Sequence, residues 1–250
     1  SIKGTTVGIK ATGTANDTIN LQQTTTKWTG DFQAKNMGNN GTGSTDAMIS
    51  DMTIYLKHDL SLDLKEGTDT INGTSGNDAL FLQNFGSNGD ELYFQDAGGN
   101  SGHPRLSGIT NINLLEGKNF LDLTSSTTSL AGKSLQITTG TNDDILWLSD
   151  ANENVNSGNG NDQITVNGGT DTLATSLGSD IVTISKNSGN LTISDFDIST
   201  DKFVFQVASN KVSVSGNQIT VDNIDPIGDY VITLSNSPDL SNLSAISTFA

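Results

Sequence analysis

The chain has 250 residues, and its 28 acidic and 12 basic residues give a formal net charge of −16 at pH 7. This charge disfavours nucleic acid and anionic membrane surfaces as partners, because both would repel the chain, and it favours divalent cations. The absence of cysteine excludes disulfides and cysteine-ligated metals, and no apolar run approaches the roughly 20 residues of a membrane-spanning helix. The start, residues 1–4, is neither an initiator Met nor a signal peptide, which indicates a processed product or a fragment.

Residues 1–130 are predicted to form an irregular β-solenoid-like region with loop insertions, the longest being 30–46 and 83–108. Aliphatic residues recur here at steps of nine: Leu62, Ile71 and Leu80, and later Ile112, Leu121 and Leu130. In an 18-residue coil, Asp69 would have Asp51 and Ser87 as same-side partners, and Asp78 would have Leu60 and Asp96. Each acid therefore has one acidic partner at most, which is too little to predict a calcium ladder in this region.

Residues 131–205 carry the clearest internal repeat. Seven aliphatic residues follow one another at steps of nine: Ile137, Leu146, Val155, Ile164, Leu173, Val182 and Leu191. A second series, two residues ahead, is acidic: Asp144, Glu153, Asp162, Asp171 and Asp180. Glycines precede the last three acids by two residues, at Gly160, Gly169 and Gly178, and Gly158 opens the first of these turns. Three positions thus share one period, which is the signature of stacked repeats.

Each repeat unit is interpreted as a Gly-rich turn followed by a very short strand. Glycine permits positive φ in the turn, and the aliphatic residue after the acid faces a shared core. Two units make one coil of 18 residues, and the stacked coils bury a continuous aliphatic column. On this geometry Asp144, Asp162 and Asp180 lie on one side of the roll, and Glu153 and Asp171 lie on the other.

Stacked coils also bring negatively charged carboxylates close together, and a cation between them would relieve their repulsion. Ca²⁺ suits such turns because it accepts six to eight oxygen ligands, mixing carboxylates with backbone carbonyls. The predicted metal-binding residues are Asp144, Glu153, Gly158, Gly160, Asp162, Gly169, Asp171, Gly178 and Asp180. The alternative is that these acids only cap turns, as Asp often does beside Gly.

The best unit, residues 157–165, resembles the repeats-in-toxin nonapeptide, Gly-Gly-x-Gly-x-Asp-x-aliphatic-x. It matches every specified position except the first, where Ser157 replaces Gly. The next units keep the fourth-position Gly, the sixth-position Asp and the eighth-position aliphatic residue, whereas the upstream units around Asp144 and Glu153 lack the glycine. The segment 191–205 is similar to the stretch that commonly follows such repeats, an aliphatic-x-Asp-Phe strand and a turn before Asp-Lys.

The resemblance implies a calcium-bound parallel β-roll on a bacterial protein that a type I system exports unfolded and extracellular calcium then folds. The export signal in such proteins is C-terminal, and the ending 245–250 is compatible with one. From residue 206 the nine-residue period stops, and 206–250 is predicted to close the roll as a C-terminal β cap of short antiparallel strands. The expected fold class is therefore all-β, a parallel β-roll or β-solenoid with a C-terminal β cap.

Residues suited to catalysis are few, and we expect no enzyme. The two histidines, His58 and His103, stand far apart in sequence without a nucleophile motif nearby. Acidic pairs such as Asp143/Asp144 and Asp195/Asp197 are sequence neighbours, which rarely flank a substrate bond as glycosidase carboxylates do.

Three functions agree with these features. The first is a calcium-dependent structural protein of the bacterial cell surface, similar to a surface-layer protein, with calcium ions, its own copies or a cell-surface glycan as partners. The second is the non-catalytic C-terminal part of a larger secreted enzyme or toxin. The third, an adhesin or ice-binding solenoid, requires a regular array of outward Thr, whereas the predicted outward residues are mixed: Gln163, Thr165, Thr172, Ala174, Ile181 and Thr183. We favour the first, and expect a secreted or surface-exposed protein without membrane insertion.

Overall fold

The computed structural model describes the backbone of residues 7–10, 18–20, 28–34, 47–54, 60–63, 69–73, 75–81, 94–95, 101–102, 105–107, 109–124, 129–222 and 228–250. Side chains are described for 18, 69–73, 75–78, 110–124, 129–222 and 228–250. The chain divides into two compact units, Ser1–Ser129 and Leu130–Ala250. Among the described residues, no helix is long and apolar enough to cross a membrane.

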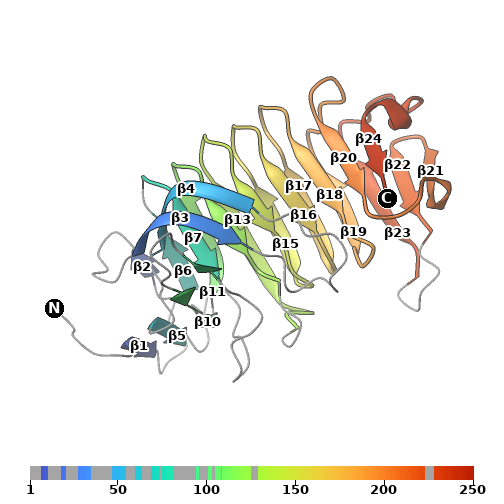
Figure 1. The fold of residues 1–250 in the computed structure, drawn as a ribbon. Helices are drawn as coiled ribbons and strands as arrows, with labels where there is room; N and C mark the ends of the chain where they lie inside the picture. The colour runs from blue at the N-terminus through green and yellow to red at the C-terminus, as the bar shows by residue number, and fades with distance from the viewer. Residues whose placement is uncertain are drawn as a thin grey trace. The chain divides into compact units, whose positions relative to one another are not determined.

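The second unit is a roll in which the chain passes alternately between two parallel sheets (Figure 1). The first sheet contains β13 (Ser134–Thr139), β15 (Asn152–Asn156), β17 (Thr170–Ala174), β19 (Asn190–Ile193) and β23 (Tyr230–Leu234). The second contains β14 (Ile145–Trp147), β16 (Gln163–Val166), β18 (Ile181–Ile184), β20 (Lys202–Phe205) and β24 (Ser247–Phe249). Every neighbouring pair in these two sets is parallel. The predicted fold class, an all-β parallel solenoid, is confirmed.

The register confirms the 18-residue coil in the centre of the roll and shows where it changes. Leu146 pairs with Ile164, and Val155 pairs with Leu173. Toward the C-terminus the coil lengthens, because the turns 185–189 and 194–201 are longer than the earlier ones: Thr170 pairs with Asn190, and Ile181 with Lys202.

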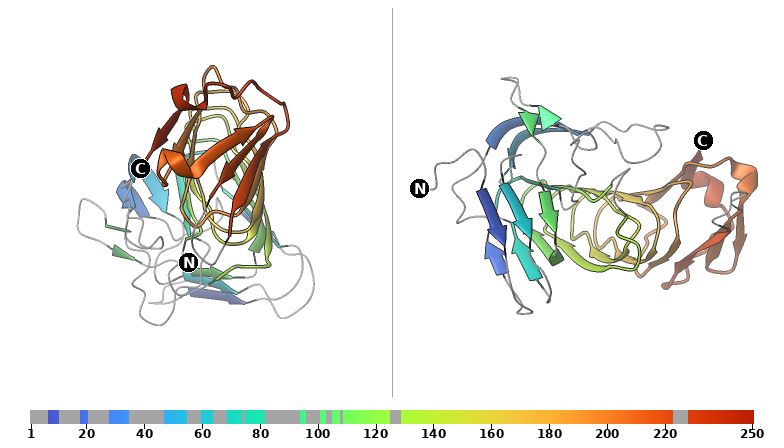
Figure 2. Two further views of the ribbon diagram at one scale, coloured as in Figure 1. Left: turned by 90° about the vertical axis from the view of Figure 1, so that its right-hand side faces the viewer. Right: turned by 90° about the horizontal axis from the view of Figure 1, so that it is seen from below.

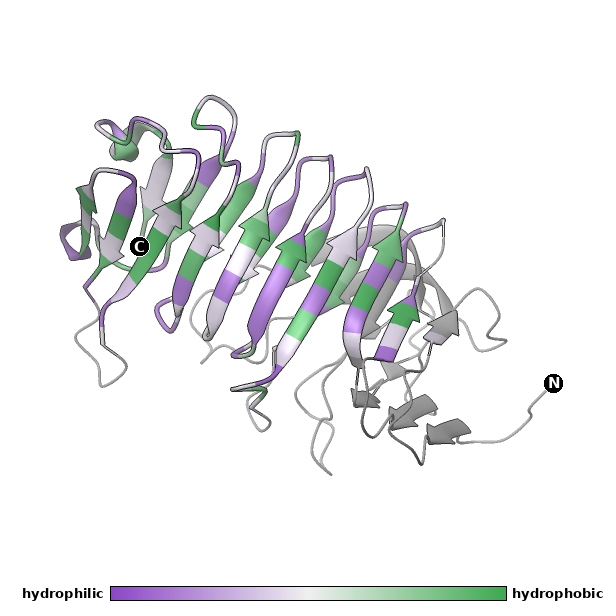
Figure 3. Cartoon of the chain, turned by 180° about the vertical axis from the view of Figure 1, so that it is seen from behind, coloured by the Kyte–Doolittle hydropathy of each residue, from purple (hydrophilic) through white to green (hydrophobic). Residues whose placement is uncertain are grey.

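The core of this unit is the aliphatic column expected from the period. All seven residues of the nine-residue series are buried: Ile137, Leu146, Val155, Ile164, Leu173, Val182 and Leu191. Each fully buried Val, Leu or Ile contributes about 1.5–3 kcal/mol through the hydrophobic effect. Most strands of this unit alternate between apolar and polar residues along their length (Figure 3), whereas β14, Ile-Leu-Trp, is apolar and buried throughout.

The C-terminal end of the roll has an aromatic core. Phe196 stacks on Phe203 with ring centroids 4.3 Å apart, and Phe205 stacks on Phe249 at 5.4 Å. In the left view of Figure 2 the orange and red strands of this end face the viewer, in front of the yellow coils. These rings fill the end of the roll, where the aliphatic column meets Phe203.

The predicted cap of antiparallel strands is only partly seen. β21 (Val212–Ser215) and β22 (Gln218–Val221) form an antiparallel extension of β23. A short 3-10 helix precedes β21 at Ser209–Lys211, and another precedes β24 at Leu243–Ala245. However, β23 and β24 pair in parallel with β19 and β20. The last strands thus continue the solenoid past residue 206, because the chain returns to both sheets after the nine-residue period has ended.

In the first unit, one sheet contains β2 (Thr18–Asn20), β6 (Asp69–Asn72) and β11 (Ile109–Leu115), and another contains β3 (Trp28–Ala34), β4 (Ala47–Ile54), β7 (Asp78–Phe81) and β12 (Phe120–Asp122). β1 (Val7–Lys10), β5 (Leu60–Asp63) and β10 (Arg105–Ser107) form a third, and β8 (Phe94–Gln95) pairs with β9 (Ser101–Gly102).

The 18-residue partners predicted for Asp69 and Asp78 are wrong. Asp69 pairs with Ile109, and Asp78 pairs with Thr53. The insertions between these strands lengthen the coils, so that side chains of β6 and β11 that hydrogen-bond to each other, such as Asn72 and Asn113, are 41 residues apart.

Candidate metal site

Three buried carboxylates form a column where the chain enters the second sheet. Asp144, Asp162 and Asp180 directly precede β14, β16 and β18, and their side chains are fully buried. The backbone N–H of Asp144 donates to Oδ1 of Asp162 at 2.8 Å, and the N–H of Asp162 donates to Oδ1 of Asp180 at 2.8 Å. The column therefore follows the 18-residue coil step by step on one side of the roll.

Asp201 extends this column by one step and was not predicted as a member. It precedes β20, and its Oδ1 accepts the N–H of Asp180 at 3.1 Å. The two residues are 21 apart, so a search at a nine-residue period cannot find the pair. The sequence feature that could have identified Asp201 is its position directly before a strand, which it shares with the other three acids.

The opposite side holds a shorter column. Glu153 and Asp171 lie in β15 and β17, and the N–H of Glu153 donates to Oδ1 of Asp171 at 2.9 Å. In the register of the sheet, Leu135 precedes Glu153 and Leu191 follows Asp171. These two carboxyl groups therefore occupy places in an otherwise aliphatic column, with no acid in the next coil on either side.

Each column leaves carboxylate oxygens unsatisfied. Oδ2 of Asp162, Asp171 and Asp180 and Oε2 of Glu153 are buried and have no hydrogen-bond partner. A buried polar atom without a partner costs about 1–3 kcal/mol, and more when it is charged. A bound cation would remove that cost, because the free oxygens are the atoms it would coordinate.

The pKa values of these groups show how unfavourable their charged forms are without a cation. Burial raises the pKa of Asp162 and of Asp180 to about 7. Burial and then the charge of Glu153 raise the pKa of Asp171 to about 9, and burial likewise raises the pKa of Glu153. Without a counter-charge these groups would take up protons near neutral pH, which Ca²⁺ binding would oppose.

The predicted glycines let the turns of neighbouring coils approach closely. Gly158 and Gly169 have φ of +81° and +89°, and a Cβ there would lie 1.7 Å from the carbonyl oxygen of Gly140 and 1.6 Å from that of Ala151. A Cβ on Gly178 would lie 1.7 Å from the carbonyl oxygen of Gly160. Backbone carbonyls are therefore packed between the turns on both sides of the roll.

The donor set suits a hard cation held jointly by side chains and backbone. No cluster of three or more His, Asp or Glu side chains able to hold a metal occurs in the described part of the chain. Carbonyl oxygens would have to complete the coordination, as Ca²⁺ allows and as the Gly-rich turns provide. The residues present fit calcium in this sense, and they offer none of the imidazole or thiolate ligands that softer metals prefer.

The first unit carries related but different groups. Asp78 is buried, and its N–H donates at 3.0 Å to Oδ1 of Asn119, an amide at the place where the roll has a carboxylate. Asp122 was not predicted: its Oδ1 accepts the N–H and the hydroxyl of Thr124, both at 2.7 Å, and burial raises its pKa to about 7. Its Oδ2 is buried without a hydrogen-bond partner.

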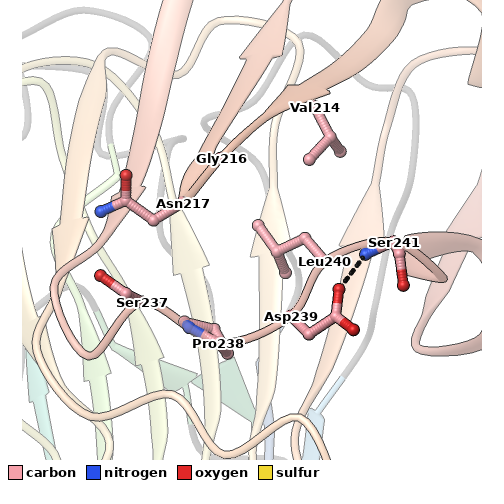
Figure 4. Close-up of a pocket in the computed structure, with 8 residues that line it drawn as sticks. All are labelled: Val214, Gly216, Asn217, Ser237, Pro238, Asp239, Leu240 and Ser241. Carbon is pink, nitrogen blue, oxygen red and sulfur yellow. Dashed lines mark hydrogen bonds between the residues drawn. The ribbon is translucent and has the colours of Figure 1, made fainter.

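The side chains of His58 and His103 are outside the described residues. A surface pocket of about 500 Å³ lies between the β21–β22 turn and the loop 237–241 (Figure 4), and its acid, Asp239, accepts the N–H of Ser241 at 2.9 Å. This pocket is formed by other elements than the carboxylate columns.

The chain matches no protein-family model and no curated protein. Among solved structures it is similar to the extracellular lipase LipA from Serratia marcescens, with 17% sequence identity and a TM-score of 0.28. The alignment covers 76% of this chain and 37% of the lipase chain, so this chain spans little more than a third of that protein's length.

Proposed function

We propose that the chain is a calcium-dependent structural protein of the bacterial cell surface, in which calcium orders the β-roll of the second unit. The single observation that carries this proposal is the set of buried carboxylate oxygens without hydrogen-bond partners, which recur coil upon coil in a roll whose glycine turns pack closely against the backbone carbonyls of the coil before. Asp144, Asp162 and Asp180 would hold ions on one side of the roll, and Glu153 and Asp171 would hold them on the other. The Gly-rich turns would supply carbonyl ligands.

The proposal also explains why the roll tolerates such acids in its core. Calcium, when bound, supplies the positive charge that the stacked carboxylates need. The protein supplies the rest: the backbone N–H groups of Asp144 and Asp162 orient the carboxylates of the following coil, and burial keeps water from competing for the free oxygens. An ion held between coils couples metal binding to coil stacking, and thus to folding.

We infer a structural rather than a catalytic role, outside the cell. A regular roll with metal inside its turns makes a rigid module, and the acidic surface would let further cations bridge neighbouring copies. Extracellular calcium would then complete the ordering of the roll and start assembly after export.

The test is a calcium titration of the purified chain. Far-ultraviolet circular dichroism should show gain of β structure, and calorimetry should give saturable binding that magnesium does not reproduce at equal concentration. Electron microscopy of the calcium-loaded protein should show ordered arrays. Identical spectra and melting curves with calcium and with chelator would refute calcium dependence, whereas calcium-induced folding without arrays would refute only the surface-layer role.

A further inference from the structure

A second column, made of hydroxyl groups, runs beside the carboxylates of the roll. Thr139 is the last residue of β13, and Ser157 and Thr175 directly follow β15 and β17, so the three lie where the chain leaves the first sheet in successive coils. All three side chains are buried. The hydroxyl of Thr139 donates to the carbonyl of Ser157, 18 residues later. The hydroxyl of Ser157 lies 3.3 Å from the carbonyl oxygen of Thr175, again 18 residues later, and 3.5 Å from that of Ala174. Each hydroxyl thus links one coil to the next.

Two carboxylates close this hydroxyl column at its C-terminal end. The hydroxyl of Thr175 lies 3.3 Å from Oδ1 of Asp195 and 3.4 Å from Oδ2 of Asp201. Asp195 also accepts the backbone N–H groups of Thr175 at 2.9 Å and Ser176 at 3.0 Å. Oδ2 of Asp201 accepts the N–H of Asp197 at 2.9 Å.

Asp201 therefore differs from the acids before it in the carboxylate column. In Asp162 and Asp180, Oδ1 accepts a backbone N–H and Oδ2 is buried without a hydrogen-bond partner. In Asp201, protein donors reach both oxygens. The carboxylate of Asp201, in the turn 194–201, is thus satisfied by the protein's own N–H groups.

We infer that the hydroxyl column of Thr139, Ser157 and Thr175, closed by Asp195 and Asp201, holds successive coils together without a cation. The inference assigns a positioning role to Ser157, the one place where the best repeat departs from the Gly that the repeats-in-toxin pattern has there. A glycine at this position has no hydroxyl to donate. These hydrogen bonds keep the coils stacked when calcium is absent. Bound calcium therefore has to contribute less of the free energy that stabilises coil stacking.

Only the statement about how much stabilisation calcium contributes rests on the proposed function; the hydrogen bonds between coils do not. A competing explanation is that these hydroxyl oxygens are themselves calcium ligands. The two explanations make different predictions for a variant that lacks the hydroxyl. If the hydroxyl forms a hydrogen bond between coils, its removal lowers stability equally with and without calcium. If it is a calcium ligand, its removal lowers the stability of the calcium-loaded protein only.

The test compares Ser157→Ala and Thr175→Val with Ser179→Ala, a control at an exposed serine in the same turn as Thr175. Hydrogen exchange of amides 135–205 and melting temperature are measured in chelator and in saturating calcium. A buried hydrogen bond removed from a unit of this size should lower the melting temperature by roughly 3–8 °C in both conditions. The control should change by less than about 2 °C, as surface substitutions generally do.

Two results would overturn the inference. The first is a loss of protection confined to the calcium-loaded protein, which would make the hydroxyls ligands. The second is a wild-type roll with no exchange protection in chelator, which would show that the hydroxyl column does not hold the coils. A wild-type protein indifferent to calcium would refute the proposed function, and the chelator measurements would still decide the role of Ser157 and Thr175.

Discussion

The backbone N–H of Asp162 donates a 2.8 Å hydrogen bond to Oδ1 of Asp180, the acid that follows it by 18 residues. One carboxylate is therefore fixed by the coil before it, while its second oxygen is buried without a hydrogen-bond partner. The contact between coils thus depends on the charge of a group in the interior. Stability should respond to calcium, to pH and to the identity of these residues together.

Replacing Asp162 by Asn should have opposite effects with and without calcium. The amide oxygen can still accept the N–H of Asp144, but the buried charge is gone. In chelator, near neutral pH, the variant should melt at or above the wild-type temperature, because its buried group needs no counter-charge. In calcium it should bind fewer ions or bind them more weakly, as calorimetry would show. Asp239→Asn, at a fully exposed acid in the loop 237–241, is the control; equal calcium binding by all three proteins would rule out Asp162 as a ligand.

The chelated protein should lose stability as pH rises from about 4 to 7. Burial raises the folded-state pKa of Asp162 and of Asp180 to about 7 from an ordinary 3.8, so the folded protein holds protons that the unfolded chain has lost. The stability that a raised pKa contributes is fully present below the pKa of the unfolded state, and it is lost as the pH rises through the pKa of the folded state. Asp171, with a pKa of about 9, should extend the loss to higher pH.

Urea unfolding between pH 4 and 9 measures this dependence. Saturating calcium should remove the decline, because the ion binds the deprotonated carboxylates and holds their pKa values low. A chelated protein with constant unfolding free energy across this range would contradict the assignment of these carboxyl groups to the interior.

Gly169→Ala should destabilise the roll by about 2–5 kcal/mol, from the left-handed backbone and the steric overlap together. Its φ is +89°, and the new Cβ would meet the carbonyl oxygen of Ala151. Gly216→Ala is a matched control, with φ of +61° and no atom within 4 Å of the new Cβ, so it should lose only about 1–2 kcal/mol. Equal losses in denaturant unfolding would show that the turns are not in close contact.

Ile164→Ala should cost about 2–5 kcal/mol in unfolding free energy, because it opens a cavity in the aliphatic column. Ile164 is fully buried, whereas Ile181, on the outer face of the neighbouring strand, is 36% exposed. Ile181→Ala should therefore change stability much less. A similar loss for both variants would mean that the two isoleucines do not lie on opposite faces of the second sheet.

Periodicity in the sequence was sufficient to predict the roll and the inward residues of its centre. A coil of constant length returns every 18th residue to the same place, so the apolar and acidic series of the chain translate directly into columns. For Ile164, Leu173 and Val182 the strand alternation and the repeat agree, and all three are buried. The placement of Asp162 between Asp144 and Asp180 follows from the same rule.

Contacts that depend on the lengths of insertions were decided only by the tertiary structure. Asp201 joins the carboxylate column after a longer turn, and Asn119 meets Asp78 across 41 residues, so neither appears at any multiple of nine. The hydrogen bonds of the Ser157 and Thr175 hydroxyls could not be predicted from the sequence either. Ser and Thr are common in this chain, and their hydrogen bonds to the next coil exist only once the coils are stacked. Local sequence specifies the period of a solenoid, whereas register across its insertions is set by how the finished coils pack.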